Sequence, residues 1–349
     1  MEAHDYLDKI ETLVDKVEDW SLLPPAPVVS VWMITFNHEA FIRQAIDGVL
    51  MQQTAFAYEL VIGDDKSTDL TPEIIQEYQQ CHPERIRLRL AKENLYSLNM
   101  KQGIGVLAAC RGKYIALCEG DDYWTDPGKL QKQVDFLEAH PECSMCFHYV
   151  SALFQATGAM QHPRLELEEP CYVLDDLLSG TVHVYPRTSS RMFRREIVSE
   201  LPPWFHDAPA TDLPLVVLCA EYGKICLLNE VMSVYRVHSG GVWSGSTLVD
   251  RSKTTLQVYQ QLRSHLGARH QKAMKTRLAR GYLALAAAQA EEGDIGQART
   301  NLRTSIAESP MGGLRRLVDV IALALRLYTP RIYRLLKSIT RLPRASVRN

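Results

Sequence analysis

The fold is decided by the stretch VVSVWMITFNHEAFIRQAIDGVL, residues 28–50. Its first nine residues form a nearly unbroken apolar run with several β-branched side chains, which is typical of a strand covered on both faces of a parallel sheet. After the polar NHE, apolar residues recur at a spacing of three to four between Phe41 and Leu50, and this indicates one face of a helix. The stretch therefore predicts a strand, a loop and a helix.

The same unit recurs over the next seventy or so residues. YELVIGDD at 58–65 reads as a second strand, and STDLTPEIIQEYQQ at 67–80 as a helix that Thr71 caps, with Pro72 in its first position. IRLRLA at 86–91 and KYIALCEGDD at 113–122 continue the series, with a helix expected over roughly 97–110. This alternation predicts an α/β fold with a doubly wound, mostly parallel sheet flanked by helices.

The rest of the chain divides into a less regular part and a helical part. TSSRMFRR at 188–195 and KICLLNEVMSVYRVH at 224–238 are strand-like, while DLPLVVLCAEYG at 212–223 is helix-like. From about residue 250 the chain is rich in Ala and Arg and poor in turn signals. We therefore expect an N-terminal helical segment (1–27), a sheet domain (28–248) and an all-helical C-terminal region (249–349).

The helical region carries a single repeat-like pattern. The spacing of one tetratricopeptide hairpin is matched by Tyr282, Leu285, Ala286, Gly293, Ala298, Leu302 and Pro310. Such repeats need stacked neighbours, so one copy favours a helical pair packed on the preceding domain over a peptide-binding array.

The C-terminal end is strongly basic. Asp319 is the one acid beyond residue 311, among the basic residues Arg315, Arg316, Arg326, Arg331, Arg334, Lys337, Arg341, Arg344 and Arg348. LVDVIALALRLY, residues 317–328, supplies an apolar helix face that is too short and too charged to span a bilayer. Two interpretations stay open: binding to an anionic membrane surface, or packing on the preceding hairpin.

Composition bounds the class of protein. With 349 residues, 46% of them hydrophobic, the chain can bury a sizeable core, and a net charge of −2 argues against a nucleic-acid partner. The chain opens without a basic, apolar leader and lacks a run of about 20 apolar residues, so a cytoplasmic location is expected. The eight cysteines are then expected to be reduced thiols, and the solitary CxxC of Cys143 and Cys146 to be packing residues.

Three carboxylates follow the strand-like YIALC at 114–118. If the extended conformation continues, Glu119 and Asp121 point to the same side, an arrangement that suits a hard cation such as Mg²⁺ or Mn²⁺. An acidic, solvated turn before a helix capped by Asp126 is an equally good interpretation of this segment alone.

A second acid pair ends the strand-like YELVIG, in the stretch VIGDDKSTD at 61–69. Two such loops on one sheet edge are suited to hold a nucleotide, since ligands lie beyond the carboxyl ends of parallel strands. The chain contains neither GxGxxG nor GxxxxGK[ST], the glycine-rich loops that cradle phosphates. Neutralisation of phosphate charge is therefore expected to come from a metal ion.

Four segments in this order resemble family 2 inverting glycosyltransferases with the nucleotide-sugar-binding GT-A fold: VSVWMITFNHEAFIRQAIDGVLMQQ, YELVIGDDKSTDLTPEII, GKYIALCEGDDYWTDPGKLQKQVDFLE and TDLPLVVLCAEYGKICLLNEVMSVYRVHSGGVWSG. The resemblance covers roughly residues 28–245. It implies Mn²⁺ or Mg²⁺ as cofactor, a nucleoside-diphosphate sugar, most often a UDP-sugar, as donor, and a glycan or lipid-linked glycan of the cell surface as acceptor. For this chain it implies a cytoplasmic enzyme, peripheral on the inner face of the cell membrane if the basic end binds lipid.

The resemblance also assigns residues. Donor binding falls on Thr35, Asn37, Glu39, Asp64, Asp65, Asn94, Glu119 and Asp121. The family's DxD motif corresponds to Glu119, Gly120 and Asp121, with Glu in place of the first Asp. Asp121 is the preferred metal ligand and Asp122 the alternative, while His238 is either a nitrogen ligand or a hydrogen-bonded core histidine.

Asp212, in ATDLPL, is the catalytic base that the resemblance implies; from the residues alone it reads as a helix N-cap. As a base it takes the proton from an acceptor hydroxyl while that oxygen displaces the nucleoside diphosphate with inversion. Trp124 and Trp243 are candidates for stacking on sugar rings, and Arg191 and Arg194 either reach phosphate or lie solvated beside a strand.

Two functions of other classes remain as alternatives. The first is a non-catalytic nucleotide-sugar-binding or scaffolding protein, against which the acids at 121 and 212 argue. The second is a nucleotidyltransferase, for which a glycine-rich, basic loop would be expected where TFNHEAF stands.

Overall fold

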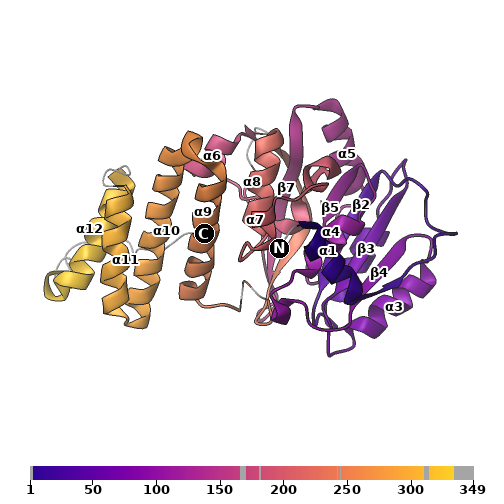
Figure 1. Cartoon of the computed structure of the whole chain (residues 1–349), viewed down its shortest axis with the longest axis horizontal. Helices are drawn as coiled ribbons and strands as arrows, with labels where there is room; N and C mark the ends of the chain where they lie inside the picture. Colours follow the sequence, from indigo (N-terminus) through magenta and orange to yellow (C-terminus); the bar gives the residue numbers. More distant parts are fainter. Residues whose placement is uncertain are drawn as a thin grey trace. The chain divides into compact units, whose positions relative to one another are not determined.

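The computed structural model of the chain describes residues 3–165, 170–180, 182–241, 243, 245–309 and 314–333 (Figure 1). The chain divides into two compact units. The first comprises residues 1–174, 182–207 and 215–241, and the second comprises 175–181, 208–214 and 242–349.

One sheet forms the centre of the first unit (Figure 1). The described residues contribute eleven strands to it, in the order β1-β4-β3-β2-β5-β10-β7-β11-β6, with β8 paired to β7 and β9 to β11. The pairs β2/β3, β2/β5, β3/β4 and β7/β11 are parallel, and the others are antiparallel. The strands are β1 (Val14–Val17), β2 (Val29–Thr35), β3 (Tyr58–Asp64), β4 (Ile86–Ala91), β5 (Tyr114–Leu117), β6 (Tyr123–Trp124), β7 (Cys143–Phe154), β8 (Ala159–Gln161), β9 (Cys171–Tyr172), β10 (Met192–Arg194) and β11 (Lys224–Val237).

Helices cover both faces of this sheet because the buried strands are apolar on both sides. On one face, Val31 and Met33 of β2 belong to a core cluster that also holds Ile46 of α2, Ile75 of α3 and Leu137 of α5. On the other, the Trp32 indole donates to the Gly103 carbonyl of α4 (2.8 Å). The helices of this unit are α1 (Ala3–Thr12), α2 (Ile42–Leu50), α3 (Thr71–Cys81), α4 (Gln102–Ala109), α5 (Lys129–Ala139) and α7 (Pro203–His206).

This architecture confirms the predicted α/β fold, with a central sheet that is parallel from β4 through β3 and β2 to β5 and with a helical C-terminal region, but several local predictions differ. The helix expected from residue 97 begins at Gln102, because Tyr96–Leu98 form a 3₁₀ turn that Asn99 ends with a φ of 55°. Residues 14–17, expected in a helical segment, form the edge strand β1 on β4.

The start of α3 also differs from the prediction. The sequence predicts Thr71 as the cap of this helix. In the structure the carboxylate of Asp69 accepts the backbone N–H of Thr71 (3.0 Å). The Thr71 hydroxyl instead accepts the N–H of His38 (2.9 Å), so it joins the loop after β2 to α3. Pro72 does lie in the first turn, as predicted.

The prediction that all eight cysteines are reduced is wrong for two of them. A disulfide joins Cys171 on β9 to Cys226 on β11, which lie opposite each other across an antiparallel pair. The residues are 55 positions apart in the sequence, so their pairing is visible only in the fold. Cys143 and Cys146 are buried packing residues, as predicted.

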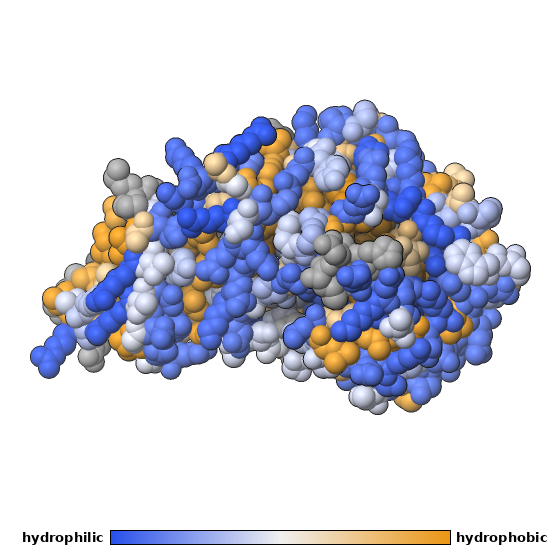
Figure 2. Space-filling view, viewed as in Figure 1, coloured by the Kyte–Doolittle hydropathy of each residue, from blue (hydrophilic) through white to orange (hydrophobic). Residues whose placement is uncertain are grey.

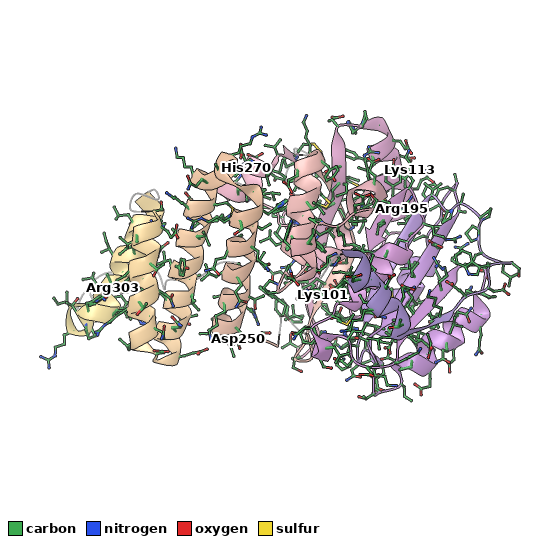
Figure 3. All side chains as sticks on the ribbon, in the orientation of Figure 1. Lys101, Lys113, Arg195, Asp250, His270 and Arg303 are labelled. Carbon is green, nitrogen blue, oxygen red and sulfur yellow. A yellow bond between two sulfur atoms is a disulfide. The ribbon has the colours of Figure 1, made fainter. Side chains whose placement is uncertain are left out.

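The second unit is helical. Its long helices are α9 (Leu248–Leu266), α10 (Gln271–Glu292), α11 (Ile295–Glu308) and α12 (Leu314–Tyr328); α6 (Leu174–Ser179) ends in this unit, and α8 (Asp212–Tyr222) begins in it. The turn between α10 and α11 uses Gly293, whose φ of 89° favours glycine, and Asp294, which accepts the N–H of Gln297. His270 lies at the start of α10 (Figure 3). Its Nδ1 is 2.9 Å from Asp175 Oδ1 of α6. Pro310, part of the expected hairpin pattern, lies outside the described residues.

One face of α12 packs against α10 and α11 while another is exposed. Leu323 and Leu327 are buried in a cluster with Ala286 and Leu302. Arg316 donates to the Ser305 carbonyl (2.6 Å), which ties the start of α12 to the end of α11. The exposed apolar side chains of α12 and the residues after it are Leu317, Val318, Ile321, Tyr328 and Ile332. Apolar surface at this end is visible in Figure 2. No helix among the described residues is long and apolar enough to cross a membrane.

Candidate functional site

Loops from the carboxyl ends of four parallel strands meet at one edge of the sheet. The loop after β2 and the loop after β3 are joined directly, since Asn37 Oδ1 accepts the N–H of Thr68 (2.8 Å) and Glu39 accepts the N–H of Leu70 (3.0 Å). Asn37 itself adopts a φ of 53°, which asparagine tolerates better than most residues. Open α/β sheets bind ligands at this edge.

The acid pair after β3, Asp64 and Asp65, accepts hydrogen bonds from its own loop and from the loop after β4. Asp64 accepts from both the N–H (3.0 Å) and the hydroxyl of Ser67, while Asp65 accepts the N–H groups of Leu95 (2.7 Å) and Tyr96 (3.2 Å). Asn94 donates to the Asp65 carbonyl (2.9 Å). Burial raises the pKa of both carboxyls, against the effect of these hydrogen bonds. These residues hold the loops after β3 and β4 together.

The acidic loop after β5 begins as a continuation of the strand. Gly120 donates its N–H to the Ile34 carbonyl (2.9 Å), so the chain keeps pairing with β2 beyond the end of β5. A Cβ at Gly120 would lie 2.8 Å from Thr35 Oγ1 and 3.0 Å from His38 Nδ1. This close approach explains why a glycine separates Glu119 from Asp121. Glu119 itself is half-buried.

Asp121 lies between two imidazoles. Its Oδ2 is 3.0 Å from Nε2 of His238, just after β11, and 3.7 Å from Nε2 of His38, in the loop after β2. Burial works against ionisation of Asp121, but the hydrogen bond with His238 and the proximity of both imidazoles hold its pKa below the usual range. Burial lowers the pKa of His38, although Asp121 opposes this effect. The three side chains form a compact polar centre.

Asp122 points elsewhere. It is fully buried, and its Oδ1 accepts the N–H of Arg236 on β11 (3.0 Å). Burial, together with the neighbouring Asp121, raises the pKa of Asp122 well above its usual value. The Arg236 guanidinium lies over the rings of Phe41 (5.1 Å) and Tyr123 (4.7 Å). Asp122 therefore links the acidic loop to the strand that carries His238.

Other predicted residues lie in different settings. Asp212 is the exposed first residue of α8 and belongs to the second unit. Trp124 is buried, and its indole donates to the Ser189 carbonyl (2.9 Å), so stacking on a sugar ring is excluded for it. Trp243 is 43% exposed. Arg191 is buried and donates to the Pro186 carbonyl (2.8 Å), rather than lying solvated beside a strand.

Sequence reasoning missed His38 and Arg236. Both lie one or two residues from positions that were singled out, Asn37 and His238. A histidine in the loop directly after the first predicted strand was the available signal for His38, because that loop lies next to the acidic loop at the ends of the adjacent strands β2 and β5. Nothing in the sequence indicates that Arg236 bonds to Asp122.

Asp121, His238 and His38 are the side chains at this edge that could hold a divalent cation, with mixed oxygen and nitrogen ligands. Asp121 offers a carboxylate oxygen, and His238 and His38 offer imidazole nitrogens on either side of it. Thr35 Oγ1 and His38 Nδ1 are buried without a hydrogen-bond partner beside Gly120. Imidazole suits Mn²⁺ better than Mg²⁺, which strongly prefers oxygen ligands.

A buried lysine lies under the acidic loop. Lys129, the first residue of α5, is fully buried; its Nζ donates to Gln133 Oε1 (2.6 Å) and lies 3.9 Å from the centre of the Trp124 ring. Burial lowers the pKa of Lys129 to about 7. The unfolded chain therefore holds this proton more tightly than the folded chain does.

Replacing Lys129 by methionine is expected to stabilise the protein at pH 7 by about 2–4 kcal/mol, because an unfavourable buried ammonium is removed. Between pH 7 and pH 10 the native form has lost the proton that the unfolded chain keeps, so wild-type stability rises with pH. The advantage of the variant should then shrink by about 1.4 kcal/mol per pH unit. Urea unfolding at several pH values measures this difference.

Lys132→Met is the matched control on the same helix, since Lys132 is partly exposed and pairs with Asp126 and Glu230. Its effect should stay within about 1 kcal/mol and should not change over this pH range. A Lys129→Met variant less stable than wild type at pH 7 would contradict the interpretation of Lys129.

The α/β sheet with its helical C-terminal region is similar in fold to solved glycosyltransferases of the GT-A type. Staphylococcus aureus TarS in complex with UDP-GlcNAc is 17% identical, with a TM-score of 0.57 over 87% of each chain. The mannosyltransferase PcManGT of Pyrobaculum calidifontis, in complex with GDP-Man and Mn²⁺, is 19% identical, with a TM-score of 0.52 over 96% of this chain and 90% of its own.

The glycosyl transferase family 2 model matches residues 30–201 of this chain. An uncharacterized protein of Mycobacterium tuberculosis strain H37Rv is 42% identical over 232 residues, which cover 64% of this chain and 63% of that protein. The match thus spans slightly less than two thirds of this curated relative.

Proposed function

We propose that this chain is a metal-dependent inverting glycosyltransferase that moves a sugar from a nucleoside-diphosphate sugar, most often a UDP-sugar in this family, to a hydroxyl of a glycan or lipid-linked glycan acceptor. The observation that carries the proposal is the contact of Asp121 with His238 and His38 at the carboxyl end of β5. The loops after β2, β3 and β4, which contain the other donor-binding candidates, border the same sheet edge.

Asp121 and His238 would hold the cation, Mn²⁺ in preference to Mg²⁺, and His38 supplies a second nitrogen next to the same carboxylate oxygen. The bound cation would neutralise charge on the donor diphosphate. Asp122 is a weaker candidate for ligation because its carboxyl is buried and faces the backbone of β11. Glu119 remains the candidate for the ribose side of the donor.

The protein residues perform the remaining chemistry. Asp64, Asp65 and Asn94 shape the loops against which the nucleoside lies. The exposed carboxylate of Asp212, at the first turn of α8, accepts the proton of the acceptor hydroxyl as its oxygen attacks the anomeric carbon. The bond to the diphosphate oxygen breaks on the opposite side of that carbon, so the stereocentre inverts.

The proposal is tested by measuring release of nucleoside diphosphate from a panel of UDP-, GDP- and TDP-sugars with Mn²⁺, with and without candidate acceptors. Release that needs both one donor and an acceptor supports a transferase. If every donor binds but none turns over with any acceptor offered, the alternative of a non-catalytic nucleotide-sugar-binding protein is favoured.

The exposed face of α12 supports a further part of the proposal, that the enzyme binds the inner surface of the cell membrane, where a lipid-linked acceptor would be met. On a helix of 3.6 residues per turn, Leu317, Ile321 and Tyr328 of α12 fall on one side, together with Val318; the exposed Ile332 follows just after the helix. The basic residues Arg334, Lys337, Arg341, Arg344 and Arg348 follow in the sequence and lie outside the described residues. An apolar stripe followed by positive charge suits an anionic lipid surface.

Replacing Leu317, Ile321 and Tyr328 together by serine should weaken flotation with phosphatidylglycerol-rich vesicles by at least about tenfold, because apolar area no longer enters the interface. Neutral phosphatidylcholine vesicles should bind the wild-type chain more weakly. Ile306→Ser, which alters an exposed apolar residue on α11, is the control and should leave flotation unchanged. Equal flotation of wild type and triple variant would refute the membrane role of α12.

A further inference from the structure

Three cysteines from three neighbouring strands meet away from the acidic loop. Cys226 on β11 lies between Cys143 on β7 and Cys171 on β9, because β11 pairs with both strands. The three sulfur atoms lie within 4.8 Å of one another. No other set of three histidine, cysteine or acidic ligand atoms is as compact in the part of the chain that the structure describes.

Two of the sulfurs are bonded and the third is in contact with them. Cys171 and Cys226 form the disulfide, and Cys143 Sγ lies 2.7 Å from Cys226 Sγ. Because the disulfide leaves a single thiol, the cluster as it stands is not suited to hold a metal ion. A thiol beside a disulfide has another chemistry, thiol–disulfide exchange.

We propose that Cys143, Cys171 and Cys226 form an exchange site in which Cys226 bonds alternately to Cys171 and to Cys143, and in which Cys171 is the sulfur released for modification. The Cys143 thiolate attacks Cys226 Sγ, so the Cys143–Cys226 bond forms as the Cys171–Cys226 bond breaks. The electron pair leaves on Cys171 Sγ, and the proton lost by Cys143 is replaced at Cys171 from solvent. The three cysteines contain one disulfide and one thiol both before and after the exchange, so no oxidant or reductant is consumed.

The burial of the three cysteines determines which of their sulfur atoms a reagent in solution can reach. Cys143 and Cys226 are buried, whereas Cys171 is exposed. The released thiol is therefore the one that a low-molecular-weight thiol, a disulfide reagent or an alkylating agent can reach. The buried pair stays protected in the second form.

Exchange would also free a short piece of chain. β9 has two residues and is held to β11 by two paired positions, together with the hydrogen bond from the Leu227 N–H to the Pro170 carbonyl (3.0 Å). The Cys171–Cys226 bond closes a loop of 55 residues that includes Asp212, whereas a Cys143–Cys226 bond leaves Cys171 outside any cross-link. Residues 170–172 would then be held by hydrogen bonds and by the packing of the buried Tyr172 ring on Phe147, without a covalent link.

The charged groups around Cys143 set the rate of the attack. Burial raises the pKa of Cys143, and Glu142 adds to this effect, whereas Lys224 on β11 and Arg194 on β10 oppose it. Since the thiolate is the attacking form, exchange should quicken as the pH rises, by up to about tenfold per unit below that pKa.

The test is alkylation of the full-length protein after oxidation by glutathione disulfide. N-ethylmaleimide is added over time, the remaining disulfides are reduced, and a second, heavy label is applied before peptide mass spectrometry. In wild type, Cys171 should take the first label steadily while Cys226 takes only the second. In Cys143→Ser, labelling of Cys171 should slow by at least about tenfold, because its bond to Cys226 can no longer be displaced. Exposed Cys81 serves as internal control for reagent access.

Further variants test the pairing itself. In Cys171→Ser, Cys143 and Cys226 should be recovered as a disulfide. Cys146→Ser, a change at a buried cysteine outside the cluster, should behave as wild type. If Cys143→Ser fails to fold, as judged by circular dichroism, Cys143→Ala gives the same comparison. The proposal is overturned if Cys171 is labelled equally fast with and without Cys143, or if Cys171→Ser leaves Cys143 and Cys226 as free thiols.

Discussion

Asp121→Asn is expected to lower the rate of nucleoside diphosphate release by at least about 100-fold. Asparagine has nearly the shape of aspartate but lacks the negative charge that would hold the proposed cation at Asp121, next to His238 and His38. Loss of several kcal/mol of electrostatic stabilisation corresponds to this factor, since about 1.4 kcal/mol is tenfold in rate. The measurement is initial rate with saturating donor and Mn²⁺.

Metal binding distinguishes this interpretation from a general loss of structure. The affinity of the protein for Mn²⁺ is obtained from the signal of free Mn²⁺ in electron paramagnetic resonance. This affinity should fall by at least about tenfold in Asp121→Asn and by less in His38→Gln. Asp135→Asn, the same chemical change on the exposed surface of α5, is the matched control. Unchanged Mn²⁺ affinity in Asp121→Asn would remove Asp121 from the metal site, whatever the rate.

Asp212→Asn should reduce turnover by about 100- to 10,000-fold, the range that general base catalysis supplies. Unlike Asp121→Asn, it should leave Mn²⁺ affinity and donor affinity close to wild type, because the base acts on the acceptor hydroxyl. Comparing turnover with donor binding by calorimetry separates the two roles.

The position of Asp212 at a helix start requires its own control. Asp212→Ser keeps a residue that suits a helix N-terminus and removes the carboxylate. If Asp212→Ser restores turnover, the residue acts on the helix and not as a base. Loss of turnover in both variants, with unfolding temperatures close to wild type, supports the catalytic role.

The fold was largely predictable because its signals are local. The apolar run before Asn37 and the helix-spaced residues from Phe41 to Leu50 each describe one element, and parallel strands bring their carboxyl ends together without further information. By contrast, the start of α4 at Gln102 depends on a turn closed by Asn99, and β1 depends on pairing with β4.

Of the candidate site, the sequence could predict only residues in loops that directly follow strands. Asp121 and His238 came from motif order, and the structure adds that they are in contact. The roles of His38, Arg236 and Cys171 depend on residues distant in sequence, and their side chains carry no periodic signal. For Trp124 the sequence suggested a role that the structure excludes. An aromatic residue beside an acidic loop suggested a sugar contact, but the Trp124 indole packs beneath that loop.

The irregularity of β11 has a consequence for how the chain tolerates change. Its pairing with β7 shifts register between Leu228 and Val231 and again between Val231 and Ser233. Because side chains alternate along a strand, such shifts determine which face every later residue presents. Deleting Asn229 or Glu230 would therefore turn the side chains of Arg236 and His238 to the wrong face of the strand, although both lie several residues away. We therefore expect residues 229–231, which are not fully buried, to be more sensitive to a change of length than to a point substitution.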